Sequence, residues 1–395
     1  MRTMQNLWPE FDNQQPLSEA AQHAHQRRRP TEQAVLSSLR AWLLHDYIVP
    51  YCRSLAATRI FRRCYWIDGL GGSPILQPLV SIAQVLAKES KPITLLSILL
   101  ETKGSKRREA NVEKSITLPK ESGVVHASWL EAAPTLLQAI DQSAAIFLLN
   151  PFAGSAPFSF EGVAPLYQRT APTELCLLIS YRQIESRLLP FLRTPAGASS
   201  FTAFLHSDRW KALLANDEGI DHVVNSLIEA FLVSIQQQHF LSVQRIALLM
   251  HTGPAVVETV PYTLIFATRR QDSLVSMNDA VCIYRRRLHE QSLQGVLTED
   301  WFAVQQRERL AEEMQQLYQR ILRQGRAQRQ RRWPELRQQI LIANFGQFTL
   351  HDYDQVIYKL LQNGEVRCEW RRQPAETPEI EDYRIPGNED ILLWK

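Results

Sequence analysis

Apolar runs of strand length alternate with helix-like periodic segments along most of this chain. In order, the runs and the helical patterns between them cover residues 63–69, 78–90, 92–101, 129–142, 144–152 and 173–181. The runs are apolar at nearly every position, which is typical of strands covered by helices on both faces of a sheet. The alternation therefore predicts an α/β fold with a mostly parallel sheet.

The pattern also predicts how this sheet unit begins and ends. Thr31 is a good N-cap, and the apolar residues after it recur at helical spacing. Later, a long helical segment at 219–238 precedes two strand-like runs, at 242–251 and 262–270, which a short loop joins. Two strands joined in this way predict an antiparallel pair at the end of the sheet.

Four regions follow from these patterns. Residues 1–30 are rich in Gln and Pro, which predicts a flexible N-terminal tail. Residues 31–290 form the sheet domain, and residues 291–333 form a basic Gln/Arg-rich helical connector. Residues 334–395 show helix, turn, helix and two short strands, which predicts a small winged-helix-like C-terminal domain.

Composition excludes several classes of protein. Hydrophobic residues make up 45% of the 395 residues and charged residues 22%, as in soluble globular proteins with a real core. The net charge of +3 does not by itself argue for nucleic acid. No apolar run has membrane-spanning length, so we expect a cytoplasmic protein that does not bind a membrane. The five cysteines are scattered without a C-x-x-C pair, so we expect no metal and no disulfide scaffold.

Polar residues follow three of the predicted strands. They are Asp68, Gly69, Gly71 and Gly72 after the first, Glu101 after the second, and Asn150, Pro151 and Phe152 after the third. Ligands bind outside the carboxyl ends of parallel strands, so these residues predict one crevice. The order is similar to that of Rossmann-like methyltransferases, in which the first loop approaches S-adenosylmethionine and the second acid holds its ribose. A simpler reading is that Asp, Asn and Gly favour turns.

The Asn150-Pro151-Phe152 segment is the most suggestive of a catalytic role. It resembles the Asn/Asp-Pro-Pro-aromatic motif of amino-methyltransferases, with one proline in place of two. In that motif the amide and a carbonyl accept hydrogen bonds from the target amine, and the ring stacks on the base. The resemblance implies that these three residues face the methyl acceptor.

Nucleic-acid contact is a further hypothesis, and it rests on an arginine strip without acidic residues. The strip comprises Arg320, Arg323, Arg326, Arg329, Arg331 and Arg332. Contact with DNA or RNA phosphates and an ordinary solvated helix face explain it equally well. The second helix of the C-terminal domain carries Asp352 and Asp354, which disfavours reading of bases in a groove. For that domain we expect protein docking or a structural role.

Across residues 36–277 the chain resembles the three-Cys-motif partner (TcmP) family. The likeness rests on several short segments that match the family in order. The family features are a helical start, a Y-I-D-G strand with its glycine loop, an F-I-E strand end, a D-P-F-G strand end with the strand after it, and a late Y-x-L-I-F-A-T strand. These segments are Leu36–Trp42, Trp66–Pro74, Leu99–Glu101, Asn150–Gly154, Thr173–Leu175 and Tyr262–Thr268, followed by Leu274 and Met277. The resemblance implies a methyltransferase-like fold and a partner protein, which in this family is a radical-SAM-like protein with three cysteines.

Two departures from the family pattern bear on activity. The loop after Asp68 is shorter than in the family, and Asn150 stands where the family has Asp. A shorter loop offers fewer backbone N–H groups to S-adenosylmethionine, so we expect a compromised cofactor site. Two hypotheses follow. In the first, the chain has a degenerate methyltransferase fold and acts as a partner protein or nucleic-acid-associated subunit of a mobile-element or defence system. In the second, it is an active methyltransferase on an amine of a nucleic acid or nucleotide.

Overall fold

The computed structural model describes ten stretches of the chain. They are residues 30–71, 76–101, 122–152, 165–215, 219–238, 240–253, 256–293, 299–329, 332–371 and 384–395. The predicted tail, except its last residue, lies outside them, as do Gly72 and Arg331.

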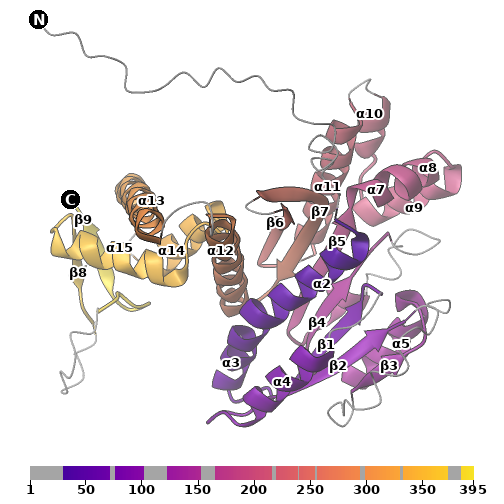
Figure 1. Cartoon of the computed structure of the whole chain (residues 1–395), viewed down its shortest axis with the longest axis horizontal. Helices are drawn as coiled ribbons and strands as arrows, with labels where there is room; N and C mark the ends of the chain where they lie inside the picture. Colours follow the sequence, from indigo (N-terminus) through magenta and orange to yellow (C-terminus); the bar gives the residue numbers. More distant parts are fainter. Residues whose placement is uncertain are drawn as a thin grey trace, which may run out of the picture.

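Seven strands form one sheet in the order β3-β2-β1-β4-β5-β7-β6 (Figure 1). The strands are β1 (Arg63–Gly69), β2 (Thr94–Leu100), β3 (Gly123–Val125), β4 (Ala144–Leu149), β5 (Thr173–Ser180), β6 (Ser242–Gly253) and β7 (Val256–Thr268). The first five are parallel, and β7 runs antiparallel between β5 and β6. The predicted α/β fold with an antiparallel end is confirmed, and this strand order with one reversed strand is methyltransferase-like.

One face of the sheet is covered by helices from both ends of the sheet unit. They are α2 (Glu32–Trp42), the π-helix η1 (Leu43–Ile48), α3 (Val49–Ala57), α4 (Leu76–Ala87) and α12 (Gln271–Leu293). The predicted start of α2 is confirmed, because the Thr31 hydroxyl accepts a hydrogen bond from Ala34 N. Apolar side chains of these helices and of alternate strand positions form one continuous core.

The opposite face is covered by α5 and by a helical segment between β5 and β6. These helices are α5 (Trp129–Ile140), α7 (Tyr181–Gln183), η3 (Ile184–Leu188), α8 (Leu189–Leu192), α9 (Pro195–Leu205), α10 (Trp210–Ala215) and α11 (Ile220–Gln236). Their apolar side chains form a second core with the sheet, and the aromatic rings of Phe201, Phe204 and Phe231 pack within it. Of the helices that the structure describes, none has the length and apolar character needed to cross a membrane.

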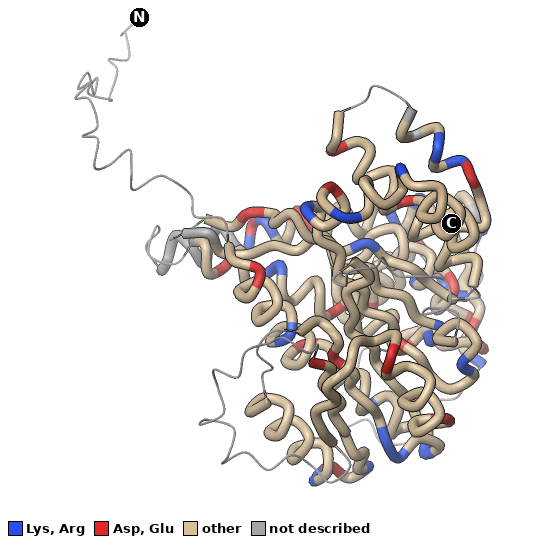
Figure 2. The backbone as a smooth tube through the Cα atoms, turned by 90° about the vertical axis from the view of Figure 1, so that its right-hand side faces the viewer, with Lys and Arg blue, Asp and Glu red and all other residues tan. Residues whose placement is uncertain are grey.

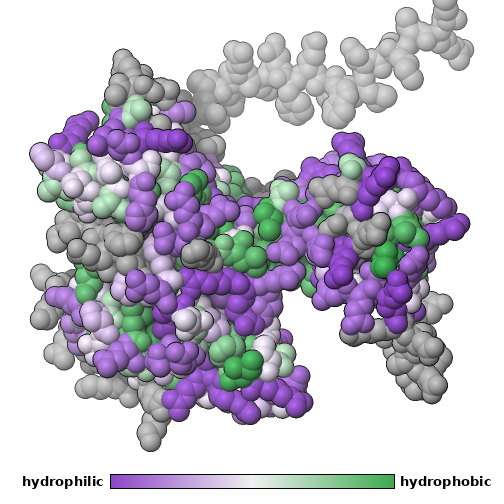
Figure 3. Space-filling view, turned by 180° about the vertical axis from the view of Figure 1, so that it is seen from behind, coloured by the Kyte–Doolittle hydropathy of each residue, from purple (hydrophilic) through white to green (hydrophobic). Residues whose placement is uncertain are grey.

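The C-terminal elements form a lobe beside the sheet unit (Figure 3). They are α13 (Glu299–Gln328), α14 (Trp333–Ala343), α15 (Leu350–Gln362) and the antiparallel pair β8 (Val366–Glu369) and β9 (Ile391–Trp394). The helix–turn–helix and the strand pair appear as predicted, while the winged-helix-like assignment stays a prediction. Leu317 and Ile321 of α13 are fully buried in this third core, so the second half of the expected connector packs with the C-terminal elements.

Helix α12 joins the lobe to the sheet unit. Its Met277 and Val281 belong to the core under the sheet, whereas its Leu274 belongs to the C-terminal core. The buried Asn278 side chain donates to Phe348 O at 2.8 Å and accepts from Gly346 N at 2.8 Å. These bonds satisfy backbone groups of the turn between α14 and α15, so the lobe is attached by directed hydrogen bonds as well as by apolar packing.

Candidate functional site

The register of the sheet brings the three predicted strand ends to one edge. Strand β1 pairs Asp68 with Leu99 of β2, and Gly69 with Leu149 of β4. Continuing both registers places Leu70, Glu101 and Asn150 side by side. With strands about 4.8 Å apart, the backbones of Glu101 and Asn150 are separated by roughly 10 Å. The carboxyl edge therefore gathers the predicted residues, as parallel topology requires.

Asp68 forms a two-point ion pair with a residue that the sequence did not single out. Arg40 Nε donates to Asp68 Oδ2 at 2.6 Å, and Arg40 Nη2 donates to Asp68 Oδ1 at 3.0 Å. The same Nη2 donates to Gly71 O at 2.6 Å, and Leu70 N donates to Asp68 Oδ1 at 3.1 Å. Arg40 is 2% exposed and Asp68 4% exposed. The acid after β1 is thus committed to a buried network that holds the glycine turn.

The sequence does carry a signal for Arg40. The apolar stripe of α2 includes Leu36 and Leu39 and continues into Leu43 and Leu44, and Arg40 lies within it at helical spacing. An arginine on a buried helix face needs a carboxylate or several acceptors, because an unpaired buried charge is costly. The position of Arg40 on the apolar face of the helix could therefore have indicated a buried acceptor, although not which residue supplies it.

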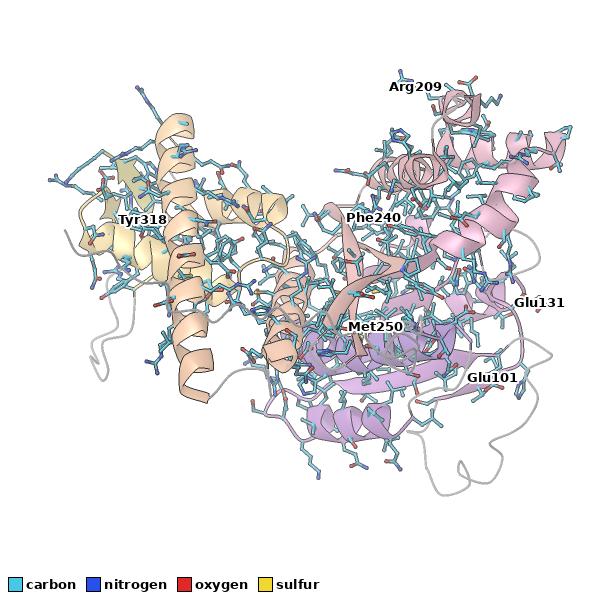
Figure 4. All side chains as sticks on the ribbon, turned by 45° about the horizontal axis from the view of Figure 1, so that its top comes forward. Glu101, Glu131, Arg209, Phe240, Met250 and Tyr318 are labelled. Atoms are coloured by element: carbon cyan, nitrogen blue, oxygen red, sulfur yellow. The ribbon has the colours of Figure 1, made fainter. Side chains whose placement is uncertain are left out.

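Glu101 is more accessible than Asp68. Its side chain is 32% exposed and contacts His126, whose Nδ1 lies 3.3 Å from Glu101 Oε2. Its backbone N donates to Val125 O at 3.0 Å, which fixes the strand end against β3. In Figure 4, Glu101 lies at the sheet's edge, far from Tyr318 of α13. A partly exposed carboxylate in this position can accept hydrogen bonds from a ligand's hydroxyl groups.

The Asn150-Pro151-Phe152 segment forms a tight turn after β4. Phe152 N donates to Asn150 Oδ1 at 3.0 Å, and Asn150 Nδ2 donates to Gln183 Oε1 at 3.0 Å. The Phe152 ring is 5% exposed and packs against Phe231, with ring centroids 6.2 Å apart. In this conformation the amide is engaged within the chain and the ring belongs to the core. The acceptor role of these residues stays a prediction.

The arginine strip is divided among different environments. Arg320 donates to the Asn344 side chain, Arg326 pairs with Glu365 at 2.7 Å, and Arg332 lies 3.9 Å from Glu335. The remaining described members, Arg323 and Arg329, are exposed, and no carboxylate of the described residues lies within ion-pair distance of either. Figure 2 shows both signs of charge along the described chain. Phosphate contact through the strip stays a prediction.

Glu174 is a buried acid that sequence reasoning did not single out as functional. It is fully buried near the start of β5, and Ser273 Oγ donates to its Oε2 at 2.7 Å. Burial raises the pKa of Glu174 to about 7. It lies at the amino edge of the sheet, opposite the predicted crevice, so we regard it as a structural group. The only feature of the sequence that could have indicated this buried acid is the glutamate within the otherwise apolar run TELCLLIS.

Within the described residues, no three His, Cys, Asp or Glu side chains gather as metal ligands. No family model matches the chain, and no curated protein matches it. Among solved structures, "Crystal structure of methyltransferase CalO6" matches with 13% identity and a TM-score of 0.26. The match covers 55% of this chain and 65% of that one, less than two thirds of its length. At this TM-score it carries no argument, so the methyltransferase-like assignment rests on the strand order.

Proposed function

We propose that this chain is a partner subunit that keeps a methyltransferase-like fold but has a reduced S-adenosylmethionine site. The observation that carries the proposal is the Arg40–Asp68–Gly71 network. Both carboxylate oxygens of Asp68 and the carbonyl of Gly71 are bound to Arg40. A ligand that took over Asp68 would leave a buried guanidinium without its counter-charge, which costs several kcal/mol.

The donor set fits only part of S-adenosylmethionine. Glu101 suits the ribose hydroxyls, because its carboxylate is accessible and accepts two hydrogen bonds. Asp68 does not suit the charged methionine end, because its carboxylate is already paired and buried. Gly71 does not compensate, because its carbonyl is also bound to Arg40. A half-matched site predicts weak binding or none.

The partner role comes from the resemblance to the TcmP family. It implies docking to another protein, which in that family is a radical-SAM-like protein with three cysteines, in a cytoplasmic mobile-element or defence system. We assign this docking to the C-terminal lobe, in which two acids of α15 are paired within the chain. Asp352 pairs with Arg286 at 2.7 Å, and Asp354 pairs with Arg337 at 2.7 Å. Of the strip's described members, Arg323 and Arg329 are the best placed for any contact with DNA or RNA.

A second candidate is an active methyltransferase on an amine of a nucleic acid or nucleotide. One observation favours it: Glu101 is accessible and level with Asn150 on the same edge of the sheet. In this case Glu101 would hold the ribose, and Asn150 would exchange Gln183 for the acceptor amine.

Isothermal titration with S-adenosylhomocysteine and S-adenosylmethionine separates the candidates. The partner proposal expects no saturable heat up to about 1 mM ligand, which corresponds to less than about 4 kcal/mol of binding. Binding in the micromolar range that Glu101→Ala weakens about tenfold or more would overturn it and favour the enzyme. Glu89→Ala is the matched control, because Glu89 is also a partly exposed acid in an ion pair and precedes β2 at the opposite edge of the sheet.

A further inference from the structure

A cleft of about 540 Å³ lies between α12, the middle of α13 and the turn before α15. Its lining includes the charged residues Arg285, Arg286, Glu290, Arg309 and Glu313, together with His289. The volume is within the range of small-molecule sites, which commonly lie where two structural units meet. The cleft is far along the chain from Asp68 and Glu101, and it shares no residue with the carboxyl edge of the sheet.

Arg285 differs from the other two arginines of the cleft. Arg286 pairs with Asp352 at 2.7 Å, and Arg309 pairs with Glu313 at 2.9 Å. Arg285 instead donates to a backbone oxygen, Gly346 O, at 3.2 Å, and no carboxylate of the described residues forms an ion pair with it. Burial lowers the pKa of Arg285. The side chain has lost part of its hydration without gaining an anion, so a bound anion would stabilise it.

The wall that holds Arg285 is built in advance. Gly346 has a φ of +71°, and a Cβ there would overlap the side chain of Val281. The turn can therefore approach α12 only because residue 346 is a glycine. Asn278 Oδ1 accepts from Gly346 N at 2.8 Å and holds the turn in this position. A fixed wall lowers the cost of ordering the site when a ligand binds.

His289 lies in the lining of the cleft beside charged groups of both signs. Burial lowers the pKa of His289 and the charge of Arg309 lowers it further, whereas the charges of Glu313 and Glu290 raise it. The two acids of the lining reduce the net charge, but Glu313 is already paired with Arg309 on the same helix. Arg285 is therefore the guanidinium group best able to offer its forked donors, a geometry that matches phosphate oxygens, and Arg286 and Arg309 flank it while paired with carboxylates.

We propose that this cleft binds a small phosphate-bearing ligand, with Arg285 as the main anchor and Arg286 and Arg309 as flanking donors. The ligand is a phosphate ester of the size of a mononucleotide, either free or as the phosphorylated end of an oligonucleotide. The proposal is independent of the S-adenosylmethionine site. One wall of the cleft belongs to the sheet unit and the other to the C-terminal lobe. The ligand would therefore contact the sheet unit through α12 and the lobe through α13.

Titration of the full-length protein with pyrophosphate and AMP tests the proposal. We expect saturable binding of both, weakened about tenfold by Arg285→Gln, because a hydrogen bond to a charged group contributes about 1.5–3 kcal/mol. Arg309→Gln weakens binding less, because Glu313 already shares that guanidinium. Arg307→Gln is the matched control, since it removes the same charge from an exposed position of α13 outside the cleft.

The titrations can overturn the proposal that the cleft binds phosphate. No saturable binding of pyrophosphate or AMP at about 10 mM, a weak-binding limit near 3 kcal/mol, would overturn the proposal. So would equal weakening by Arg307→Gln, because binding would then follow overall charge. If Arg285→Gln fails to fold, the exposed Arg309→Gln decides instead. A 5′-phosphorylated oligonucleotide that binds more tightly than AMP, and than its 5′-hydroxyl form, identifies a nucleic-acid end as the source; equal affinity identifies a free nucleotide.

Discussion

Arg40 and Asp68 lie 28 positions apart in the chain and form a buried, two-point ion pair beneath the turn after β1. The pair connects α2, which begins the sheet unit, to the strand end that carries the glycine turn. Arg40 also holds the Gly71 carbonyl at 2.6 Å. The positions of Leu70 and Gly71 therefore depend on the Arg40–Asp68 pair as well as on the local backbone.

Breaking this pair should be costly. Asp68→Asn leaves a buried guanidinium with a neutral partner, and we expect the free energy of unfolding to fall by about 3 kcal/mol. Urea denaturation measures the loss. The double variant Arg40→Met/Asp68→Asn should recover part of it, because the unpaired charge is gone. Arg53→Met breaks an exposed pair with Glu89 and should cost less than about 1 kcal/mol. A loss below about 1 kcal/mol for Asp68→Asn would contradict a stabilising network.

Glu174 should make stability depend on pH. Its pKa is about 7 in the folded protein because of burial, above the ordinary value for a glutamate. Between these two values the folded state holds a proton that the unfolded state has lost, so stability falls as the pH rises through this window. We expect Glu174→Gln to become more stable relative to the wild type by about 3 kcal/mol between pH 4.5 and 7.5.

Chemical denaturation at a series of pH values checks the Glu174 prediction. Glu229→Gln is the control, because the Glu229 side chain is 58% exposed and should show no such trend. A constant difference between Glu174→Gln and the wild type would mean that the buried acid titrates at its ordinary value.

Asn278 should hold the lobe on α12. Asn278→Ala removes hydrogen bonds to Phe348 O and from Gly346 N, and it leaves both backbone groups buried without their partner. Each such group costs about 1–3 kcal/mol, so we expect a loss of about 3 kcal/mol. Hydrogen exchange should show faster amide exchange in the turn at 346–348 and in α15. Asn363→Ala, at the exposed end of α15, should leave this exchange unchanged.

Of the strip's described members, Arg323 and Arg329 are the best placed for nucleic acid, because both are exposed and no carboxylate of the described residues pairs with either. For the variant with both changed to Gln, the slope of log affinity against log salt for duplex DNA should fall by about 1.8, since each lost phosphate contact removes about 0.9. Fluorescence anisotropy measures the slope. A variant with exposed Arg53 and Arg62 changed to Gln controls for net charge. Equal slopes in the wild type and in both double variants would show that Arg323 and Arg329 do not contact phosphates.

The sheet could be predicted well because its signal is local. The apolar run 63–69 is β1 residue for residue, and the paired late runs became β6 and β7. Strand β3 gave no such signal, because it has only three residues and its two valines are exposed. The helices between residues 181 and 215 were also not predicted. They are short and interrupted by Pro190 and Pro195, so they show little periodicity.

The candidate site was harder to predict because it depends on contacts between distant segments. The strand ends meet where parallel topology requires, but no local pattern shows that Arg40 reaches Asp68 or that Phe152 turns into the core. The arginine strip illustrates a different limit. Its regular members recur every third residue, and each step turns them about 60° around an α-helix. Within α13, which ends at Gln328, Arg320, Arg323 and Arg326 therefore spread over about a third of the helix surface, and Arg320 and Arg326 meet different neighbours.

Helix α12 places its side chains in two hydrophobic cores at once, with Met277 in one and Leu274 in the other. A substitution in this helix must therefore be compatible with both cores, whose other residues come from distant parts of the sequence. An excised fragment ending near residue 290 would carry Leu274 exposed to water, and the remaining lobe would lack the partner of Gly346 and Phe348. The lobe is accordingly not an interchangeable module. Substitutions in the lobe and in the sheet unit have to remain compatible with the same helix, α12.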